Sequence, residues 1–254
     1  MITAVNQENN NLFAKFRWLT IVLLLFGNLY IWGTLWQFSG QNLMVAFLDV
    51  GQGDAILIRA PGGRTVLIDG GPGKNILRRI ASELPFFARS LDLLIETHPD
   101  TDHAGGLPDV VGKYTVRGIL KPCLNADNPY DQALDKIASE KKVKEICATA
   151  GQIIDLGSGA KLEILYAGEG ERTDTNGASV VVRLYYGATS FLLMGDATVK
   201  EEKYLVYYAP EKLDADVYKV SHHGSRESND EQFLQLVSPQ ISVISVGAGN
   251  RYGH

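Results

Sequence analysis

The segment from residue 98 to residue 103, His-Pro-Asp-Thr-Asp-His, constrains the fold more than any other part of this chain. It places four potential metal ligands within six residues: His98, Asp100, Asp102 and His103. The mostly apolar residues just before it, 91–97, predict a buried strand, so His98 lies where that strand runs out into a loop. Layered α/β folds form their sites at the carboxyl ends of such strands. We therefore expect the four side chains to converge on one point there.

The ligand types in this segment indicate which ion it would hold. Imidazole and carboxylate together suit zinc, manganese or iron, and a carboxylate-rich set favours harder ions such as manganese. A single Asp in this position would be interpreted more simply as the cap of the following helix. Two His and two Asp at this spacing favour the metal interpretation.

Two later strands are followed by similar side chains. The apolar run 191–194 is followed by Gly195 and Asp196, and the run 215–220 by His222 and His223. Taken alone, Asp196 would be a helix cap and the two histidines would be surface residues. Neighbouring side chains diverge, so we expect one of the two histidines to be a primary ligand.

The order of apolar runs indicates a layered fold. Strands are expected at 43–50, 55–59, 65–68, 91–97, 117–121, 162–166, 179–186, 190–194, 215–220 and 241–246. Helical spacing occurs at 76–84, 131–142, 198–208 and 232–237, with a short helix after the metal motif. Strand-rich halves interleaved with helices indicate two sheets covered outside by helices. The residues alone support an α/β or α+β class and no finer assignment.

Five further blocks complete the pattern, and they occur in this order: FLDVGQGD at 47–54, VLIDGG at 66–71, LLMGD at 192–196, KVSHHGS at 219–225 and NRYGH at 250–254. With the 98–103 motif they resemble the metallo-β-lactamase superfamily, whose H-x-H-x-D-H signature has Asp100 here in place of its second His. The closer resemblance, over residues 43 to 254, is to the hydrolase domain of the ComEC family of DNA-uptake proteins. It implies a four-layer αββα sandwich.

The resemblance also implies a site with two divalent metal ions, zinc or manganese. The ligands that it implies are His98, Asp100, Asp102, His103, Asp196 and His222. Asp196 would bridge the two ions, and Asp69 would orient the metal loop. His222 is the preferred ligand of the histidine pair, which leaves His223 to an outer or substrate contact. Asp49 and Asp54 are interpreted equally well as residues that stabilise a turn.

The catalytic residues expected on this basis are Asp102, Asp196, Lys219, His223 and His254. Lys219 or His223 would neutralise a phosphate, and His254 or His223 would protonate the leaving oxygen.

The chain departs from the superfamily in two respects. No histidine occurs between residues 121 and 195, so the usual third ligand of the first metal is missing, and Asp174, Asn176 or a water is expected in its place. The first site should then bind its ion more weakly than the second. Related domains continue past Gly253-His254, so we expect a domain truncated at its C-terminus.

The N-terminal part of the chain predicts a membrane anchor. Residues 18–38 carry no formal charge over 21 positions, enough for a helix of roughly 31 Å. Tryptophans lie toward both ends of this segment, and Lys15 and Arg17 precede it, which favours a cytoplasmic N-terminus. We therefore expect a cytoplasmic segment at 1–17, a transmembrane helix at 18–38, a linker at 39–42 and an extracytoplasmic domain at 43–254.

Two other interpretations of the N-terminal segment are weighed. A secretory signal peptide has an apolar region of about 7 to 15 residues and a small-x-small cleavage site, which are not found here, so an uncleaved anchor is favoured. A buried core helix is the second alternative, because Asn28 and Gln37 are polar.

Composition adds two limits. Cys123 and Cys147 are the only cysteines and are expected as packed thiols or an optional disulfide rather than metal ligands. The net charge of −5 includes the carboxylates assigned to the metals, and no basic run occurs, so any nucleic-acid affinity must be local.

These observations favour a membrane-anchored, metal-dependent hydrolase, an extracytoplasmic phosphodiesterase or nuclease linked to competence and DNA uptake. Its expected partners are DNA or another phosphodiester, the membrane and a separate DNA permease. One alternative is a hydrolase of a cell-envelope phosphodiester of the choline phosphate type, of a lactone or of a β-lactam. The other is a non-catalytic binding module with a degenerate metal site.

Overall fold

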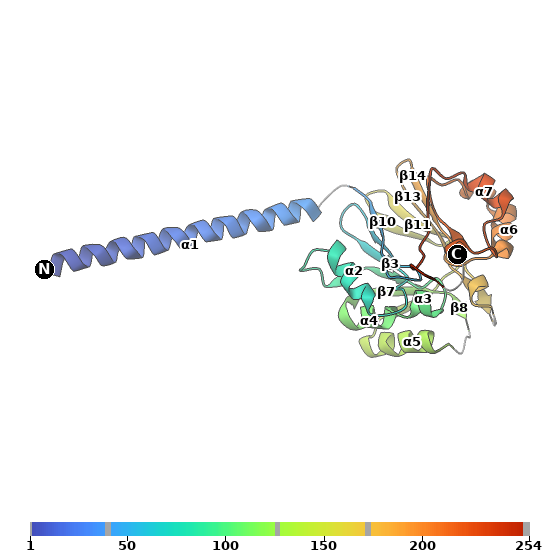
Figure 1. The fold of residues 1–254 in the computed structure, drawn as a ribbon, viewed down its shortest axis with the longest axis horizontal. Coiled ribbons are helices and arrows are strands. Elements are labelled where there is room, and N and C mark those ends of the chain that lie inside the picture. Colours follow the sequence, from blue (N-terminus) through green and yellow to red (C-terminus); the bar gives the residue numbers. More distant parts are fainter. Residues whose placement is uncertain (1, 39–41, 125–127, 171–173, 251–254) are drawn as a thin grey trace. The chain divides into compact units, whose positions relative to one another are not determined.

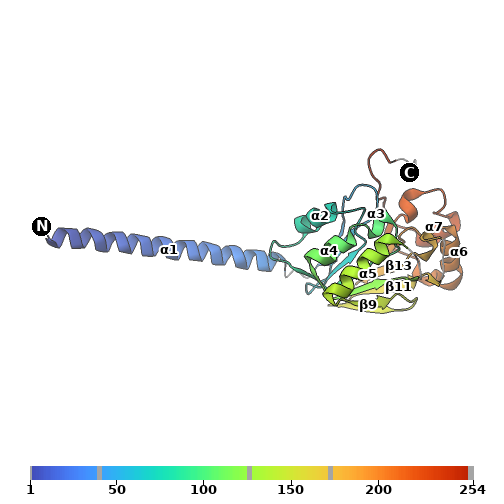
Figure 2. The same cartoon turned by 90° about the horizontal axis from the view of Figure 1, so that it is seen from below.

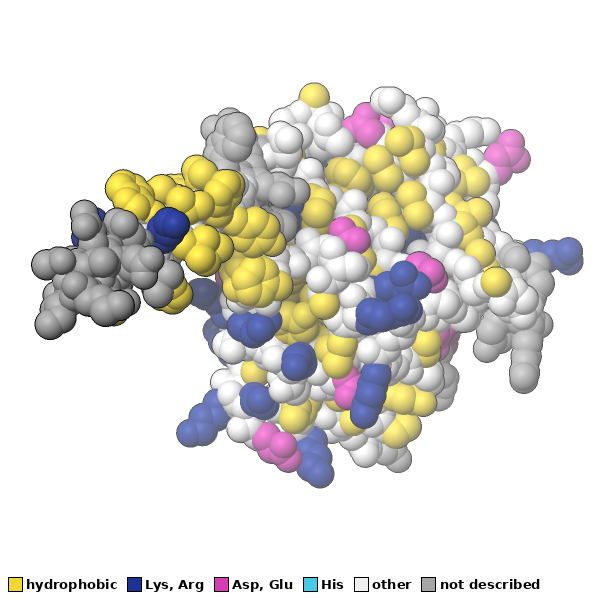
Figure 3. Space-filling model, turned by 60° about the vertical axis from the view of Figure 1, so that its left-hand side comes forward, with side chains coloured by type: hydrophobic (Ala, Val, Ile, Leu, Met, Phe, Trp, Pro, Cys, Tyr) yellow, Lys and Arg dark blue, Asp and Glu magenta, His cyan; other side chains and the backbone are white. Residues whose placement is uncertain are grey.

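The computed structural model describes residues 2–38, 42–124, 128–170 and 174–250. The chain divides into two compact units, residues 1–40 and 41–254. The first unit is the helix α1 (Ile2–Phe38), which begins well before the expected residue 18. Its segment Lys15–Gly33 has a mean hydropathy of 1.4 and is long and apolar enough to cross a membrane. No part of this segment is buried, which argues against the buried-core interpretation, and Figure 3 shows its hydrophobic side chains on the surface.

Two six-stranded sheets form the second unit. The first has the order β1 (Met44–Phe47), β2 (Ile56–Arg59), β3 (Thr65–Ile68), β5 (Leu93–Ile95), β7 (Gly118–Lys121) and β9 (Lys144–Cys147). The second has the order β10 (Ile153–Gly157), β11 (Ala160–Tyr166), β13 (Val181–Tyr186), β14 (Thr189–Leu193), β15 (Val217–Lys219) and β16 (Ile241–Val243). Each sheet begins with antiparallel pairs and ends with parallel ones, from β3 and from β14 onward.

Alternation along the strands explains why the two sheets stack. On β2, Ile56 and Ile58 belong to one buried cluster and Leu57 to another. The cluster of Ile56 and Ile58 also contains Leu162, Val182 and Leu193 of the second sheet, so it is the core between the sheets. Successive side chains of a strand point to opposite faces, so a strand that is apolar throughout must be covered on both.

The outer faces of the sheets are covered by helices (Figures 1 and 2). Helices α2 (Asn75–Glu83), α4 (Leu107–Lys113) and α5 (Pro129–Lys141) bury their apolar residues with Leu57 and Leu94 against the first sheet. Helices α6 (Val199–Tyr208) and α7 (Glu231–Val237) do the same with Val181 and Leu192 of the second. The expected αββα sandwich is therefore confirmed.

The remaining elements are short. They are β4 (Ser90–Leu91) paired with β6 (Thr115–Val116), β8 (Cys123–Leu124) paired with β12 (Glu169–Gly170), α3 (Thr101–Ala104), and the 3₁₀ turns η1 (Asn176–Ala178), η2 (Pro210–Lys212) and η3 (Ser221–Gly224). A disulfide joins Cys123 to Cys147, whose Cα atoms are 5.2 Å apart, which selects the bridged alternative of the two expected for these cysteines.

Candidate metal centre

The candidate ligands come from the carboxyl ends of four strands. In the first sheet, Asp69 follows β3 and His98 follows β5, which are adjacent and parallel. In the second sheet, Asp196 follows β14 and His223 follows β15, which are also adjacent and parallel. Parallel neighbours end at the same edge of a sheet, and the two edges meet here. All four residues therefore follow the ends of strands, as their positions in the sequence predict.

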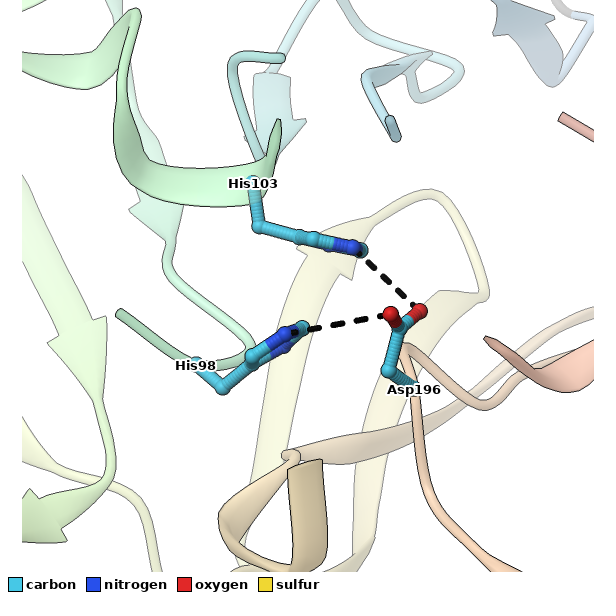
Figure 4. A group of neighbouring side chains, drawn as sticks. All are labelled: His98, His103 and Asp196. Atoms are coloured by element: carbon cyan, nitrogen blue, oxygen red, sulfur yellow. Dashed lines mark ion pairs between the residues drawn. The ribbon is translucent and has the colours of Figure 1, made fainter. Parts of the chain in front are cut away.

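His98, His103 and Asp196 lie at the centre of this site (Figure 4). The Nε2 atom of His103 is 3.2 Å from Oδ1 of Asp196, and Nε2 of His98 is 4.0 Å from its Oδ2. The two imidazole rings are 4.1 Å apart between centroids. One ligand atom from each of the three residues falls within 4.8 Å of the others, and all three residues are buried. Asp196 thus faces both histidines, one with each carboxylate oxygen, and its role as a bridge between two ions stays a prediction.

Hydrogen bonds at the far side of each ring set the orientation of these histidines. The Thr97 hydroxyl donates to Oδ2 of Asp69 at 2.7 Å, so at 3.1 Å it must accept from Nδ1 of His98. Nδ1 of His103 donates to the same Asp69 oxygen at 2.8 Å. Asp69 also accepts the Thr97 backbone N–H at 2.8 Å, which confirms the expected orienting role. A ring held through Nδ1 presents its Nε2 to the site, the arrangement found in histidine metal ligands.

The histidine pair departs from the sequence preference. Nε2 of His223 lies 3.3 Å from both Nε2 of His103 and Oδ2 of Asp196, whereas Nε2 of His222 is 3.8 Å from the same Asp196 oxygen. Nδ1 of His223 donates to the Ser245 carbonyl at 2.8 Å, so its Nε2 also faces the site. His223 and not His222 shares a cluster of ligand atoms with Asp102 and His103 among the described residues. The geometry therefore places the second histidine deeper than the one chosen from the sequence.

The turn that carries these histidines is strained. His222 and His223 have φ values of 48° and 53°, in the left-handed region that is uncommon for residues other than Gly, although His, Asn and Asp adopt it more often than most. Such residues cost on the order of 1–3 kcal/mol each and persist where the surrounding structure imposes them. In an extended strand, two consecutive side chains would point to opposite faces. This turn instead directs both imidazoles toward Asp196.

Lys219 lies at the site, as expected, but inside it rather than at its surface. Its side chain is fully buried, its ammonium pairs with Asp54, and Nζ is 3.9 Å from Oδ1 of Asp196. A phosphate bound at the surface cannot reach an ammonium enclosed in this way. The structure instead supports a role in which Lys219 balances the charge of Asp54 and Asp196.

Asp54 is the site residue that the sequence argument undervalued. It is 1% exposed and shares ligand-atom clusters with Asp196 and His223 and with Asp69 and His103. Gly53 makes this placement possible: a Cβ there would lie 2.0 Å from the Asp102 carbonyl, to which the Asp54 N–H donates at 3.1 Å. Asp49, by contrast, is exposed; it accepts the Gly51 N–H and pairs with Arg79, as a turn residue would. The FLDVGQGD block gives no local sign that Asp54 enters the site, because the hydrogen bond that places it there is made to Asp102, far along the chain.

The remaining predicted residues lie at the rim or outside the described part. Oδ2 of Asp100 is 3.7 Å from Nε2 of His98, and Oδ2 of Asp102 is 3.5 Å from Nε2 of His223. Asp102 and His103 belong to α3, which begins earlier than expected. Asp174 is exposed, and the Asn176 side-chain oxygen is buried without a hydrogen-bond partner among the described residues. His254 lies outside the described residues.

Charges in the site are strongly coupled. Burial lowers the pKa of His98 to about 3, so this ring is neutral. Burial also acts to lower the pKa of His103, but the Asp196 and Asp69 carboxylates raise it well above its usual value. In the same way, the hydrogen bonds that His223 donates to the Asp102 and Asp196 carboxylates outweigh burial and raise its pKa to about 9. Burial opposes ionisation of Asp196, yet the charge of His103 holds its pKa well below the usual range.

These properties fit a metal centre. Protons on His103 and His223 supply the positive charge that balances the buried carboxylates. A divalent cation can supply that positive charge in place of the two protons. Nε2 of His98 is buried and has no hydrogen-bond partner among the described residues, an arrangement that is costly unless the atom has a ligand to bind. Buried imidazole and carboxylate donors of this kind suit zinc or manganese. Thr97, which the sequence argument passed over, contributes by holding both Asp69 and His98.

Comparisons with known proteins agree with this geometry. Residues 48–248 match the sequence model of the metallo-beta-lactamase superfamily. ComE operon protein 3 of Bacillus subtilis is 29% identical over 233 residues, covering 83% of this chain and 29% of that protein. Competence protein ComA of Neisseria gonorrhoeae is 32% identical over 211 residues, covering 83% and 28%. Recombination protein 2 of Haemophilus influenzae is 32% identical over 218 residues, covering 84% and 25%. The chain thus spans less than a third of the length of these relatives.

Solved structures show the same fold. The metallo-beta-lactamase fold protein YhfI from Bacillus subtilis matches with a TM-score of 0.52 at 13% identity, over 82% of this chain and 98% of that one. CmlA, a diiron beta-hydroxylase from Streptomyces venezuelae, matches with a TM-score of 0.52 at 16% identity, over 80% and 45%. At such identities the likeness concerns the fold alone, and the reaction must be argued from the site.

Proposed function

Because this chain belongs to the metallo-beta-lactamase superfamily, we propose that its domain is a metal-dependent phosphodiesterase that cleaves DNA. The observation that carries the proposal is the convergence of His98, His103 and Asp196, with one ligand atom of each within 4.8 Å. Each of the buried histidines His98, His103 and His223 has its Nδ1 atom engaged, so that Nε2 is directed to the site. Such preorganisation is typical of metal-binding histidines.

The proposed ligands divide into two groups around Asp196. His98 with Asp100 would hold one cation, and Asp102, His103 and His223 would hold the other, with Asp196 shared. A pair of divalent cations, when bound, lowers the pKa of a water and polarises a phosphoryl oxygen. Asp69 keeps His103 in the tautomer that leaves Nε2 toward the site, and Lys219 offsets the charge of Asp54. His222, partly exposed beside Asp196, is in position to contact substrate.

Support for DNA as substrate comes from the relatives, two of which are named competence or recombination proteins. The chain corresponds to about a quarter of their length, so the proposal assigns it the cleavage of DNA, with a separate DNA permease as a proposed partner. We further propose that α1 anchors the domain, with Lys15 and Arg17 on the cytoplasmic side and the metal centre outside.

The test is cleavage of DNA by the full chain in detergent. The protein would be loaded with manganese or zinc, its metal content measured by elemental analysis, and then incubated with labelled single-stranded DNA and with a small chromogenic phosphodiester. Asp196→Asn, which keeps the shape of the side chain but removes its charge, is the matched inactive variant. We expect cleavage by the native chain and loss of at least a hundredfold in the variant, roughly the cost of removing one key electrostatic group.

Absence of cleavage by protein that carries its metal would defeat the phosphodiesterase proposal. In that case a chain that binds DNA without cleaving it would be a binding module with a metal centre. A chain that hydrolyses the small phosphodiester but not DNA would point to a cell-envelope substrate instead.

A further inference from the structure

Four tyrosines form a continuous row on the second sheet and its covering helix. The rings of Tyr166 on β11 and Tyr204 on α6 are 5.4 Å apart between centroids, those of Tyr204 and Tyr208 are 4.5 Å apart, and those of Tyr207 and Tyr208 are 4.8 Å apart. Exposure rises along the row, from 8% at Tyr166 through 41% at Tyr204 to 65% at Tyr208 and 78% at Tyr207. The inner ring is thus part of the core, and the outer rings are exposed to solvent. We call Tyr166, Tyr204, Tyr207 and Tyr208 the tyrosine row.

Helix geometry places lysines beside the row. Residues four apart are neighbours on a helix surface, so Lys200 lies next to Tyr204, and Lys203 next to Tyr207. Both lysines are exposed. The row therefore has two ammonium groups beside it, each one helical turn before a tyrosine.

The acidic residues of α6 do not oppose these cations on the exposed face. Glu201 and Glu202 are 2% and 0% exposed. Glu201 accepts hydrogen bonds from Thr198 at the start of the helix, and Glu202 accepts the backbone N–H groups of Asn229 and Asp230. The exposed surface of α6 is consequently made of two lysines and three tyrosines, with no exposed aliphatic side chain of large size.

The row is connected to the metal centre at two points. Helix α6 begins three residues after Asp196, and it places Tyr208 about 14 Å along the helix axis from Val199. The Tyr166 hydroxyl donates to the Gly177 carbonyl at 2.9 Å, in the loop whose neighbour Ser179 contacts Nδ1 of His98 at 3.5 Å. Through α6 and the loop at 177–179, the row thus adjoins the segments that carry Asp196 and contact His98.

From these contacts we propose that the tyrosine row and its two lysines form a stacking path for single-stranded DNA that leads to the metal centre. The proposal rests on the proposed DNA-cleaving function, because it supplies the substrate for that site. Exposed aromatic rings stack on bases of any sequence, and flanking cations attract the phosphates. Bases paired within a duplex are not free to stack on a protein surface, so the path selects single strands.

Binding can be measured separately from cleavage. The full chain in detergent, kept free of metal with EDTA, would be titrated into a fluorescent oligothymidylate of about 16 nucleotides, near the upper end of site sizes for single strands. An abasic oligonucleotide of equal length has the same phosphates but no bases to stack. The variant Tyr204→Ala/Tyr207→Ala/Tyr208→Ala would be compared with the corresponding triple Phe variant, which keeps the rings.

We expect the Ala variant to bind oligothymidylate about tenfold more weakly or worse, and the abasic strand as the native chain does. The Phe variant should keep most of the affinity, and Lys200→Ala/Lys203→Ala should weaken both ligands alike. Equal binding of oligothymidylate by native and Ala chains would overturn the stacking path, as would equal losses on both ligands or equal affinity for a duplex. Thermal unfolding of each variant checks that it is folded.

Failure of this proposal is distinguishable from failure of the proposed function. If the row binds DNA but loaded protein cleaves nothing, the stacking path stands and the phosphodiesterase proposal falls. If the Ala variant cleaves a small chromogenic phosphodiester at the native rate and binds oligothymidylate normally, the metal centre stands and the path falls.

Discussion

Glu96 is a carboxyl group buried two residues before the first metal-motif histidine. Burial, together with the charge of Asp131, raises its pKa to about 8 against the lowering effect of Lys121. One of its side-chain oxygens has no hydrogen-bond partner among the described residues. The group therefore keeps its proton at neutral pH.

Glu96→Gln should change how stability depends on pH. Because the folded state holds the Glu96 proton more tightly than the unfolded state, the resulting stabilisation is complete below pH 4.5 and is lost as pH rises through 8. The loss is on the order of 4 kcal/mol for a fully buried carboxyl. In the Gln variant this loss should disappear, so that urea unfolding of the metal-free protein changes less between pH 5 and pH 9. Glu140→Gln, on the exposed side of α5, is the control and should behave as the native chain.

The two adjacent histidines make a second prediction at the same scale. Since Nε2 of His223 is 3.3 Å and Nε2 of His222 is 3.8 Å from Oδ2 of Asp196, His223→Ala should weaken zinc binding more. We expect a loss of about a hundredfold or more for His223→Ala and about tenfold for His222→Ala, because loss of a residue outside the ligand set typically costs about 10- to 100-fold in metal affinity. Calorimetric titration with zinc measures both. A larger loss for His222→Ala would restore the preference drawn from the sequence.

Among the secondary-structure elements, the edge strands were the hardest to predict. Strands β9 and β10 form an outer edge of each sheet and were not expected, because their residues are mostly exposed and show no apolar run. The central strand β3 was predicted with its observed bounds, because its four residues are all buried. Burial on both faces leaves a signal in the sequence, and a half-solvated edge strand leaves little.

The disulfide connects one of these edge strands to the neighbouring β8. Its half-cystines are 24 residues apart in the chain, and a loop of this length corresponds to about 3 kcal/mol of stabilisation. Cys123→Ala/Cys147→Ala should therefore lower the free energy of unfolding by that amount, and the variant should unfold at a lower denaturant concentration. A reductant should shift the native chain to the same midpoint and leave the variant unchanged. If reductant shifts both equally, the bridge is not the cause.

At the scale of the whole molecule, the candidate metal centre lies where the two sheets meet. His98 follows a strand of the first sheet, and Asp196 and His223 follow strands of the second, so an ion held by these three residues would link the halves of the sandwich. Ligands that bind only the folded state stabilise it by mass action, about 2.7 kcal/mol at a hundredfold excess over Kd. Because the proposed ligands come from both sheets, the stabilisation by a bound ion would act on the whole domain.

Removal of metal should accordingly lower the melting temperature. We expect EDTA to lower it by several degrees, roughly 2–4 °C per kcal/mol for a domain of this size, and added zinc to restore it. In Asp196→Asn the melting temperature should not respond to either reagent. A native chain that melts at the same temperature with and without zinc, while elemental analysis shows bound metal, would contradict the link between the sheets.

The sequence by itself determined the ligand types, the strand ends that carry them and the layered fold class, because buried strands and the polar residues after them are local patterns. Only the tertiary structure decided which residues meet. His223 rather than His222 faces the other ligands because a left-handed turn rotates both rings. Asp54 joins the site because Gly53 lets the backbone approach Asp102. Lys219 is enclosed because two sheets close over it. Distances across the interface between two sheets depend on both at once, and no local pattern records them.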